Sequence, residues 1–315
     1  MIKGNRPTQP ACLSDAKTES EQRKAKEYYE FDPARIPAFT FNAYRARGVK
    51  DALEDMFQGK CAFCESQFVN HGVHIEHFRP KGGVQPQRSA AMQAGYWWLA
   101  CQWENLLPTC IGCNTEATRT LPDGSRKMIG KGNYFPLSEG QQHATSEGYL
   151  HTETPLLINP GMINPARYFE FSVANSLGKT YSLIHPREID ADGKMRAELS
   201  IDAYGLNRHR LVATRTARLK DLETDLQDWR TQLLRMESTS NSVEKEEFRA
   251  EVQKRLETIL KRYVDRKSPF SAACFTFVRD WLKQHQLGKP PEQLQTNAYG
   301  QRVERSISAG NALTS

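Results

Sequence analysis

The sequence contains no long hydrophobic run. No stretch reaches the roughly 18 consecutive apolar residues that a membrane-spanning helix needs, and residues 1–25 are polar and mixed in charge, without the apolar centre of a signal peptide. We therefore expect a cytoplasmic protein. With 315 residues and a hydrophobic fraction of 38%, the chain has enough material for one large or two modest globular domains.

Charge of one sign is not strongly dominant either. The 43 Lys and Arg residues exceed the 37 Asp and Glu residues by six, an excess that permits a polyanionic partner but does not demonstrate one. No stripe of aromatic and basic residues marks a platform for single-stranded nucleic acid. Composition alone therefore leaves the partner open.

Cysteine is sparse, and its placement is uneven. Of the seven cysteines, four form two Cys-x-x-Cys pairs, and in a reducing compartment this pattern and the odd total favour a metal site over disulfides. Two such pairs supply the four thiolate ligands of a closed structural zinc site. A thioredoxin-like redox pair would not explain why the motif occurs twice. The predicted zinc ligands are Cys61, Cys64, Cys110 and Cys113.

The segment between the cysteine pairs is dense in His, Glu, Asn and basic residues. Residues 73–77 alternate with a period of two, which predicts a short strand that ends at Glu76 and His77, and residues 105–109 predict a second strand. Asn114 is expected at the start of a following helix. Because four sulfur ligands leave no open position for water, we expect chemistry from this segment and not from the zinc.

The hydrophobic period changes along the chain. A helix is predicted over residues 48–58, and strands with long loops are predicted over 131–184. Apolar residues recur three and four apart over 219–233 and again over 243–263, which predicts a helical hairpin, and a third helix is predicted over 270–285.

These patterns divide the chain into four parts. The two ends are assigned from their polar composition, and the helical region is assigned from its period. We expect a loose N-terminal arm over residues 1–25, a domain with the cysteine pairs over 26–185, a C-terminal helical region over 186–288 and a disordered tail over 289–315.

Three short motifs carry a resemblance to a known family. They are Glu76-His77, Asn105-Leu106 and Cys113-Asn114. Together they resemble zinc-stabilised HNH endonucleases, which have a ββα-metal fold. The resemblance implies an α+β protein in which a ββα-metal nuclease core, stapled by the four-cysteine zinc site, precedes a strand and loop region and a helical hairpin. It also implies that Glu76 and Asn114 hold a catalytic Mg²⁺ or Mn²⁺, that His77 is the general base, and that Asn105 fixes the loop carrying His77.

These residue types suit phosphodiester hydrolysis. Histidine ionises near neutral pH and can deprotonate a nucleophile, and oxygen ligands favour Mg²⁺ or Mn²⁺ over Zn²⁺. Each residue also has a simpler interpretation: His77 as a packed strand residue, Asn105 as a turn cap and Asn114 as a helix cap. His74 is interpreted as a solvated strand residue, not as an additional ligand.

Basic residues around the motifs are candidates for binding the substrate phosphate. Arg79 and Lys81 follow the proposed base, and their alternative interpretation is an ordinary turn. Close relatives in the HNH family often carry Lys three residues after the helix Asn, where this chain has Ala117. Either a nearby cation replaces that lysine or the contact is missing, which puts the catalytic rate in question. The candidate replacements are Arg119, Lys127 and Lys131.

Longer stretches are similar to the PtuB-type HNH proteins, which pair with an SMC- or ABC-like ATPase in Septu and some retron anti-phage systems. The similar stretches are residues 57–65, 75–81, 96–100, 135–137, 156–160 and 204–208. This resemblance implies an effector nuclease that a PtuA-type ATPase licenses, and we expect DNA, ahead of RNA, as its substrate. In the retron case the partners include a reverse transcriptase and its nucleic acid. The alternative is a catalytically inactive, zinc-stapled adaptor that binds nucleic acid or the ATPase.

Overall fold

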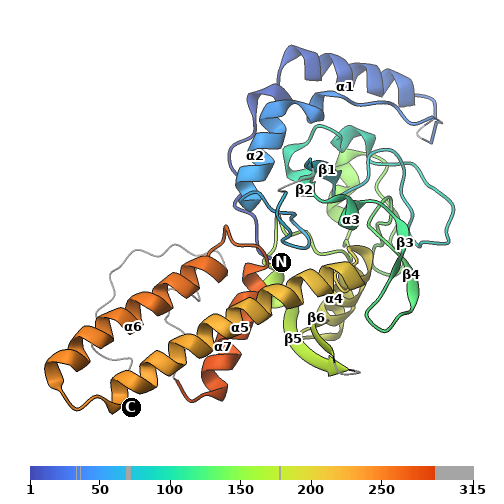
Figure 1. The fold of residues 1–315 in the computed structure, drawn as a ribbon. Coiled ribbons are helices and arrows are strands. Elements are labelled where there is room, and N and C mark those ends of the chain that lie inside the picture. The colour runs from blue at the N-terminus through green and yellow to red at the C-terminus, as the bar shows by residue number, and fades with distance from the viewer. Residues whose placement is uncertain (33, 36, 69–71, 177–178, 288–315) are drawn as a thin grey trace.

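The computed structural model describes residues 1–287 apart from 33, 36, 69–71 and 177–178. The tail predicted to be disordered, 289–315, lies outside the described residues. A rounded body of short strands, loops and helices contains the N-terminal half of the chain, and a long helical hairpin projects from it (Figure 1). None of the helices in the described part is both long and apolar enough to cross a membrane.

The body contains short strands and helices. Its elements are α1 (Ala16–Tyr29), α2 (Arg47–Phe57), β1 (His74–His77), β2 (Leu106–Thr109), α3 (Ile111–Asn114), β3 (Ala117–Thr120) and β4 (Arg126–Ile129). The C-terminal part of the chain contains β5 (Phe169–Ser176), β6 (Lys179–Pro186), α4 (Ala191–Ala203), α5 (His209–Ser238), α6 (Ser242–Tyr263) and α7 (Ser271–Gln284). Short 3-10 helices cover Ala11–Leu13, Ala43–Arg45, Trp97–Leu99, Trp103–Asn105, Glu147–Thr152 and Pro165–Arg167.

The strands of the described residues form three separate antiparallel pairs: β1 with β2, β3 with β4, and β5 with β6. The two strands predicted around the cysteine pairs are confirmed, and they pair so that His77 lies opposite Leu106 and Glu76 lies opposite Leu107. The α+β class is therefore confirmed. The ββα-metal assignment of the core remains a prediction.

The helix expected after the second cysteine pair differs from the prediction. Asn114 does not begin this helix but ends it, because α3 is one turn long and Thr115 is already extended, with ψ of 124°. The carbonyls of Cys113 and Asn114 accept hydrogen bonds from the backbone N–H groups of Lys131 (2.8 Å) and Gly132 (2.7 Å). A returning segment thus satisfies the end of α3, and the helix has no need to continue.

Residues 1–25 do not form a loose arm, so that expectation is wrong. Met1 and Ile2 are buried in the main core, and α1 begins at Ala16 with a cap in which Asp15 accepts a hydrogen bond from the Thr18 N–H. The hydrophobic pattern of α1 is weak in the sequence because the helix is mostly polar and buries only Thr18, Ala25 and Tyr29.

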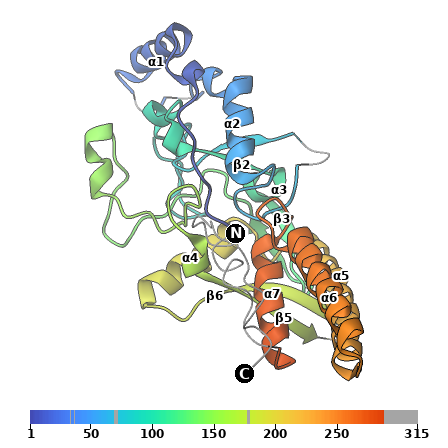
Figure 2. The same cartoon turned by 90° about the vertical axis from the view of Figure 1, so that its left-hand side faces the viewer.

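The predicted helical hairpin and third helix are confirmed as α5, α6 and α7. Their apolar faces form a second core, separate from the core of the body, and Figure 2 shows α7 beside the pair formed by α5 and α6. Inside this core the Trp229 indole donates a hydrogen bond to the Val252 carbonyl at 3.0 Å. α5 connects the two cores, since Leu211 packs in the first and Leu219 in the second.

Candidate active site and metal centre

The two cysteine pairs converge. Their four Sγ atoms all lie within 4.8 Å of one another, and Cys64 and Cys110 are 3.7 Å apart. A tetrahedral zinc site with Zn–S bonds near 2.3 Å separates its sulfurs by ~3.8 Å, so the arrangement fits a zinc ion. Within the described residues it is the only such cluster of three or more His, Cys, Asp or Glu side chains. The residues that would hold the ion are the predicted four: Cys61, Cys64, Cys110 and Cys113.

The first cysteine pair is attached to β2. The Ala62 N–H donates to the Pro108 carbonyl at 2.9 Å, and the Cys110 N–H donates to the Cys61 Sγ at 3.3 Å. The turn after Cys64 requires a left-handed residue, which is Glu65 with φ of 61°. These two N–H contacts link the segment of the first pair to that of the second.

Arg208 is a further residue of this centre that the motif analysis missed. Its guanidinium lies 3.3 Å from the Cys113 Sγ, 3.7 Å from that of Cys110 and 3.9 Å from that of Cys64. Burial alone would lower the pKa of Arg208, but the three sulfurs outweigh burial and raise it. Gly112 makes this approach possible, because a Cβ atom there would lie 2.9 Å from the guanidinium. The available signal was the position of Arg208 at the end of the 204–208 stretch.

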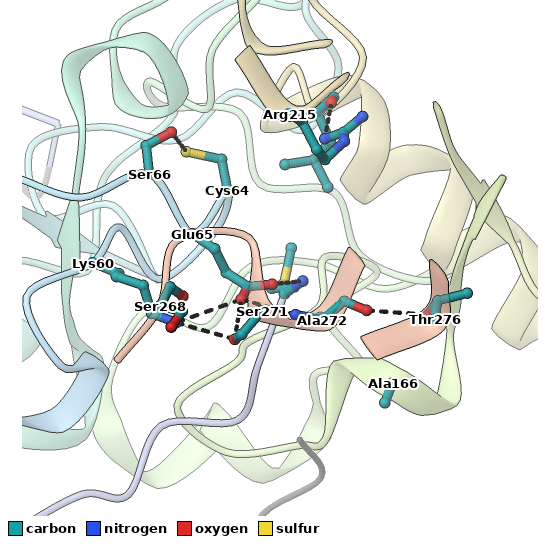
Figure 3. Close-up of polar contacts among 12 residues, drawn as sticks. Lys60, Cys64, Glu65, Ser66, Ala166, Arg215, Ser268, Ser271, Ala272 and Thr276 are labelled. Atoms are coloured by element: carbon teal, nitrogen blue, oxygen red, sulfur yellow. Dashed lines mark hydrogen bonds and ion pairs between the residues drawn. The ribbon is translucent and has the colours of Figure 1, made fainter. Parts of the chain in front are cut away.

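A buried polar network joins the first cysteine pair to α7 (Figure 3). Glu65 accepts hydrogen bonds from the Ser271 hydroxyl at 2.9 Å and the Ala272 N–H at 3.3 Å, and it lies 3.5 Å from the Lys60 ammonium. Burial by itself would raise the pKa of Glu65, but the Met1 ammonium and Lys60 outweigh burial and lower it to about 2. The carboxylate therefore stays charged and anchors the start of α7 to the cysteine centre.

A polar cleft of about 470 Å³ lies beside the cysteine centre, and four of the predicted site residues line it. They are Glu76, His77, Lys81 and Asn114. β1 supplies the first two, the turn after β1 supplies Lys81, and α3 supplies Asn114. Oxygen donors from Glu76 and Asn114 are suitable ligands for a hard divalent cation that keeps several waters.

His77 is held in one tautomer. Its Nε2 lies 2.9 Å from the Ala100 carbonyl, and because a carbonyl can only accept, Nε2 carries the proton and Nδ1 keeps its lone pair. Burial lowers the pKa of His77 well below its usual value, and the charges of Lys81, Lys131 and Arg45 lower it further. The imidazole is therefore neutral at neutral pH, with Nδ1 as the nitrogen that can accept a proton.

Asn105 brackets the loop that follows His77. Its Oδ1 accepts from the Arg79 N–H at 2.7 Å, and its Nδ2 donates to the Arg79 carbonyl at 3.0 Å and the Leu99 carbonyl at 3.2 Å. This buried amide uses both its acceptor and its donors on backbone groups, which is the geometry that the predicted orienting role requires.

The carboxylate of Glu76 is already paired with a lysine. The Lys131 ammonium is fully buried and donates to the Glu76 Oε1 at 2.6 Å, to the His77 carbonyl at 3.0 Å and to the Gly132 carbonyl at 3.4 Å. Burial raises the pKa of Glu76 and lowers that of Lys131, while their mutual attraction opposes both shifts. All three N–H donors of Lys131 are thus engaged, and only one Glu76 oxygen is bound to it.

The other basic side chains that were candidates for binding phosphate contact groups outside the cleft. Arg79 pairs with Glu153 at 2.9 Å and does not line the cleft, which favours its interpretation as a structural turn residue. Lys127 pairs with Asp202, and Arg119 contacts the Thr115 carbonyl. Of the three candidate replacements for the missing lysine, Lys131 alone contacts the candidate catalytic residues, and it binds the carboxylate of one and the backbone of the other. His74 is exposed at the cleft, as expected for a solvated strand residue.

No protein-family model matches the chain. The chain is 33% identical over 231 residues to Septu protein PtuB of Bacillus mycoides (strain KBAB4), a match that covers 71% of this chain and 68% of PtuB. It is also 25% identical over 165 residues to Septu protein PtuA of the same strain, covering 52% of this chain and 20% of PtuA. These relatives give no support to a retron reverse transcriptase as a partner. The extent of the first match shows that the chain belongs to the Septu PtuB family.

Proposed function

We propose that this protein is a metal-dependent HNH-type endonuclease that hydrolyses phosphodiester bonds of nucleic acid as the effector of an anti-phage defence system, and we expect DNA, ahead of RNA, as its substrate. The observation that carries the proposal is the state of His77. It is a neutral imidazole whose Nε2 is tied to the Ala100 carbonyl, in a cleft that it shares with Glu76 and Asn114. A general base needs a free lone pair and a fixed orientation, and this histidine has both.

The chemistry follows from these positions. Nδ1 of His77 removes a proton from water as the water oxygen bonds to phosphorus and the bond from phosphorus to the leaving oxygen breaks. The Ala100 carbonyl keeps the resulting imidazolium in place, and a proton from solvent neutralises the leaving oxygen. Glu76 and Asn114 would hold a divalent cation, which would supply positive charge to the substrate phosphate. Asn105 holds the backbone around Arg79, and so fixes the loop that follows His77.

A PtuA-type ATPase is the proposed partner. The Septu protein PtuA contains a region that is similar to half of this chain. That region is only 20% of PtuA. A region that occurs both as a separate PtuB-type chain and inside a PtuA chain is expected to work next to the remainder of PtuA. We therefore expect the nuclease to act in a complex with such an ATPase.

The decisive experiment measures cleavage of plasmid DNA and of RNA by the full chain, alone and with a PtuA-type partner, in Mg²⁺ or Mn²⁺. His77→Ala is expected to lower the cleavage rate by about 10²–10⁴-fold, the usual contribution of a general base. The matched control is His151→Ala, because His151 is exposed in the 3-10 helix Glu147–Thr152. Persistent cleavage by the His77 variant, with zinc content and folding intact, would exclude the assigned base.

The second candidate function is an adaptor without catalysis. Two observations favour it: Glu76 is already neutralised by Lys131, and Ala117 stands where relatives often carry lysine. Metal binding separates the two functions. The enzyme should bind one tight zinc ion and also Mn²⁺ at a weaker site that Glu76→Gln removes, whereas an adaptor should bind the zinc ion alone.

A further inference from the structure

Three cationic side chains line the same cleft as His77, and two of them lie outside the HNH-like motifs. Arg45 ends the 3-10 helix Ala43–Arg45, and Lys50 lies near the start of α2. Lys81 belongs to the turn after β1. Segments before and after the first cysteine pair thus bring positive charge to one cavity.

None of these three side chains is held in a close ion pair within the described part of the chain, although the charge of Lys81 acts on Glu76. Neither Arg45, Lys50 nor Lys81 forms an ion pair there, whereas other basic side chains around the body are paired, such as Arg79, Arg88, Lys127 and Lys131. Of the described residues that line the cleft, Glu76 alone is acidic, and Lys131 already neutralises it. The cleft therefore carries an uncompensated positive charge, which favours a bound anion.

Tyr44 connects this charge to the candidate base. Its ring lies edge-on to the His77 ring, with centroids 4.6 Å apart. The Lys81 ammonium lies 5.1 Å from the centroid of the same ring, and the Arg45 Nε donates to the Tyr44 hydroxyl at 3.1 Å. An anion held by Arg45 and Lys81 would therefore lie close to the imidazole that is proposed to activate water.

We propose that Arg45 and Lys50, together with Lys81, form a phosphate-binding wall that holds the nucleic-acid backbone next to His77. The wall binds through charge and reads no base, because the aromatic ring on it, that of Tyr44, is buried and already packed against His77. This inference rests on the proposed nuclease function and adds the residues that position its polyanionic substrate.

The test is the salt dependence of binding of a fluorescent DNA duplex to the full, zinc-loaded chain. All variants carry His77→Ala, so that the duplex stays intact. Each lost phosphate contact lowers the slope of log K against log salt by about 0.9 for duplex DNA, so Arg45→Gln with Lys50→Gln should reduce the loss of affinity between about 50 and 200 mM salt roughly tenfold. The charge-preserving pair Arg45→Lys with Lys50→Arg should restore the slope.

The matched control removes two exposed cations of α6 with Lys254→Gln and Lys261→Gln, and its slope should stay unchanged. If the Arg45 and Lys50 variant behaves like this control, the phosphate-binding wall is wrong, while cleavage by the chain with intact His77 would leave the nuclease proposal standing. If the chain with intact His77 neither binds nor cuts nucleic acid, with or without its partner, both proposals are wrong.

Discussion

The cysteine centre and the cleft are neighbours along the chain, since Cys113 belongs to one and Asn114 to the other, yet they balance charge in opposite ways. Four thiolates around Zn²⁺ leave a negative surplus, and Arg208 lies against three of the sulfurs. In the cleft, the one carboxylate among the described lining residues is paired with Lys131, and further cations line the walls. The first centre is thus suited to hold a cation permanently. The second is suited to bind a phosphate and to admit a cation with it.

Removing one thiolate from the cysteine centre should have the largest effect on metal binding and folding. Cys110→Ser leaves three sulfur ligands, and structural zinc sites contribute on the order of 10–16 kcal/mol of binding free energy to folding. We expect zinc content to fall from one ion per chain toward zero and the body to lose its cooperative thermal transition. Cys12→Ser is the control, because Cys12 lies outside the cluster. A folded, zinc-free Cys110 variant would show that the backbone contacts alone hold the centre together.

Removing the lysine from the cleft should have the next largest effect. Lys131→Met leaves the Glu76 carboxylate buried without its partner, and breaking a buried ion pair costs about 3–5 kcal/mol of unfolding free energy. Zinc should remain bound, because Lys131 donates no hydrogen bond from its side chain to a cysteine. The double variant Glu76→Leu with Lys131→Met removes both charges and should recover most of the stability. Chemical denaturation measures both, and an unchanged midpoint for the single variant would contradict the buried pair.

Removing the guanidinium of Arg208, which lies against the sulfurs, should have the smallest effect. It tests whether this charge contributes to zinc affinity. Arg208→Met removes the N–H donors to three thiolates, and the loss of such an outer partner typically lowers metal affinity by about 10–100-fold. Competition with a chelator measures this change directly. Arg210→Met, on the exposed surface of α5, is the control. Equal zinc affinity in the two variants would mean that Arg208 is only a packing residue.

The fold was predictable where its signal is local in the sequence. The alternation over 73–77 and the three- and four-residue spacing over 219–233 predicted β1 and α5 correctly, because strand and helix periods are properties of neighbouring residues. The N-terminal helix was missed because it buries only three residues, and the segments it packs against, residues 43–45 and 97–99, are distant in the sequence. The length of α3 was missed for a similar reason, since residues 131–132 end it from across a hairpin.

The candidate site shows the same division. Glu76, His77 and Asn114 were recognised from short motifs, and all three line one cleft. No motif indicates that Lys131 binds Glu76, because the two residues are 55 positions apart. Arg79 shows the converse, since its position next to the site in the sequence does not bring its side chain into the cleft.

The sequence by itself determined the two pairs of candidate metal ligands, because each Cys-x-x-Cys pair places two thiols within reach of one ion through local geometry alone. Only the tertiary structure determined which charged side chains surround the cysteine centre and the cleft. It brings Arg208 to the sulfurs, Lys131 to Glu76 and Arg45 with Lys50 to the cleft. Electrostatic energy depends on distance in space and on burial, and neither is set by separation along the chain.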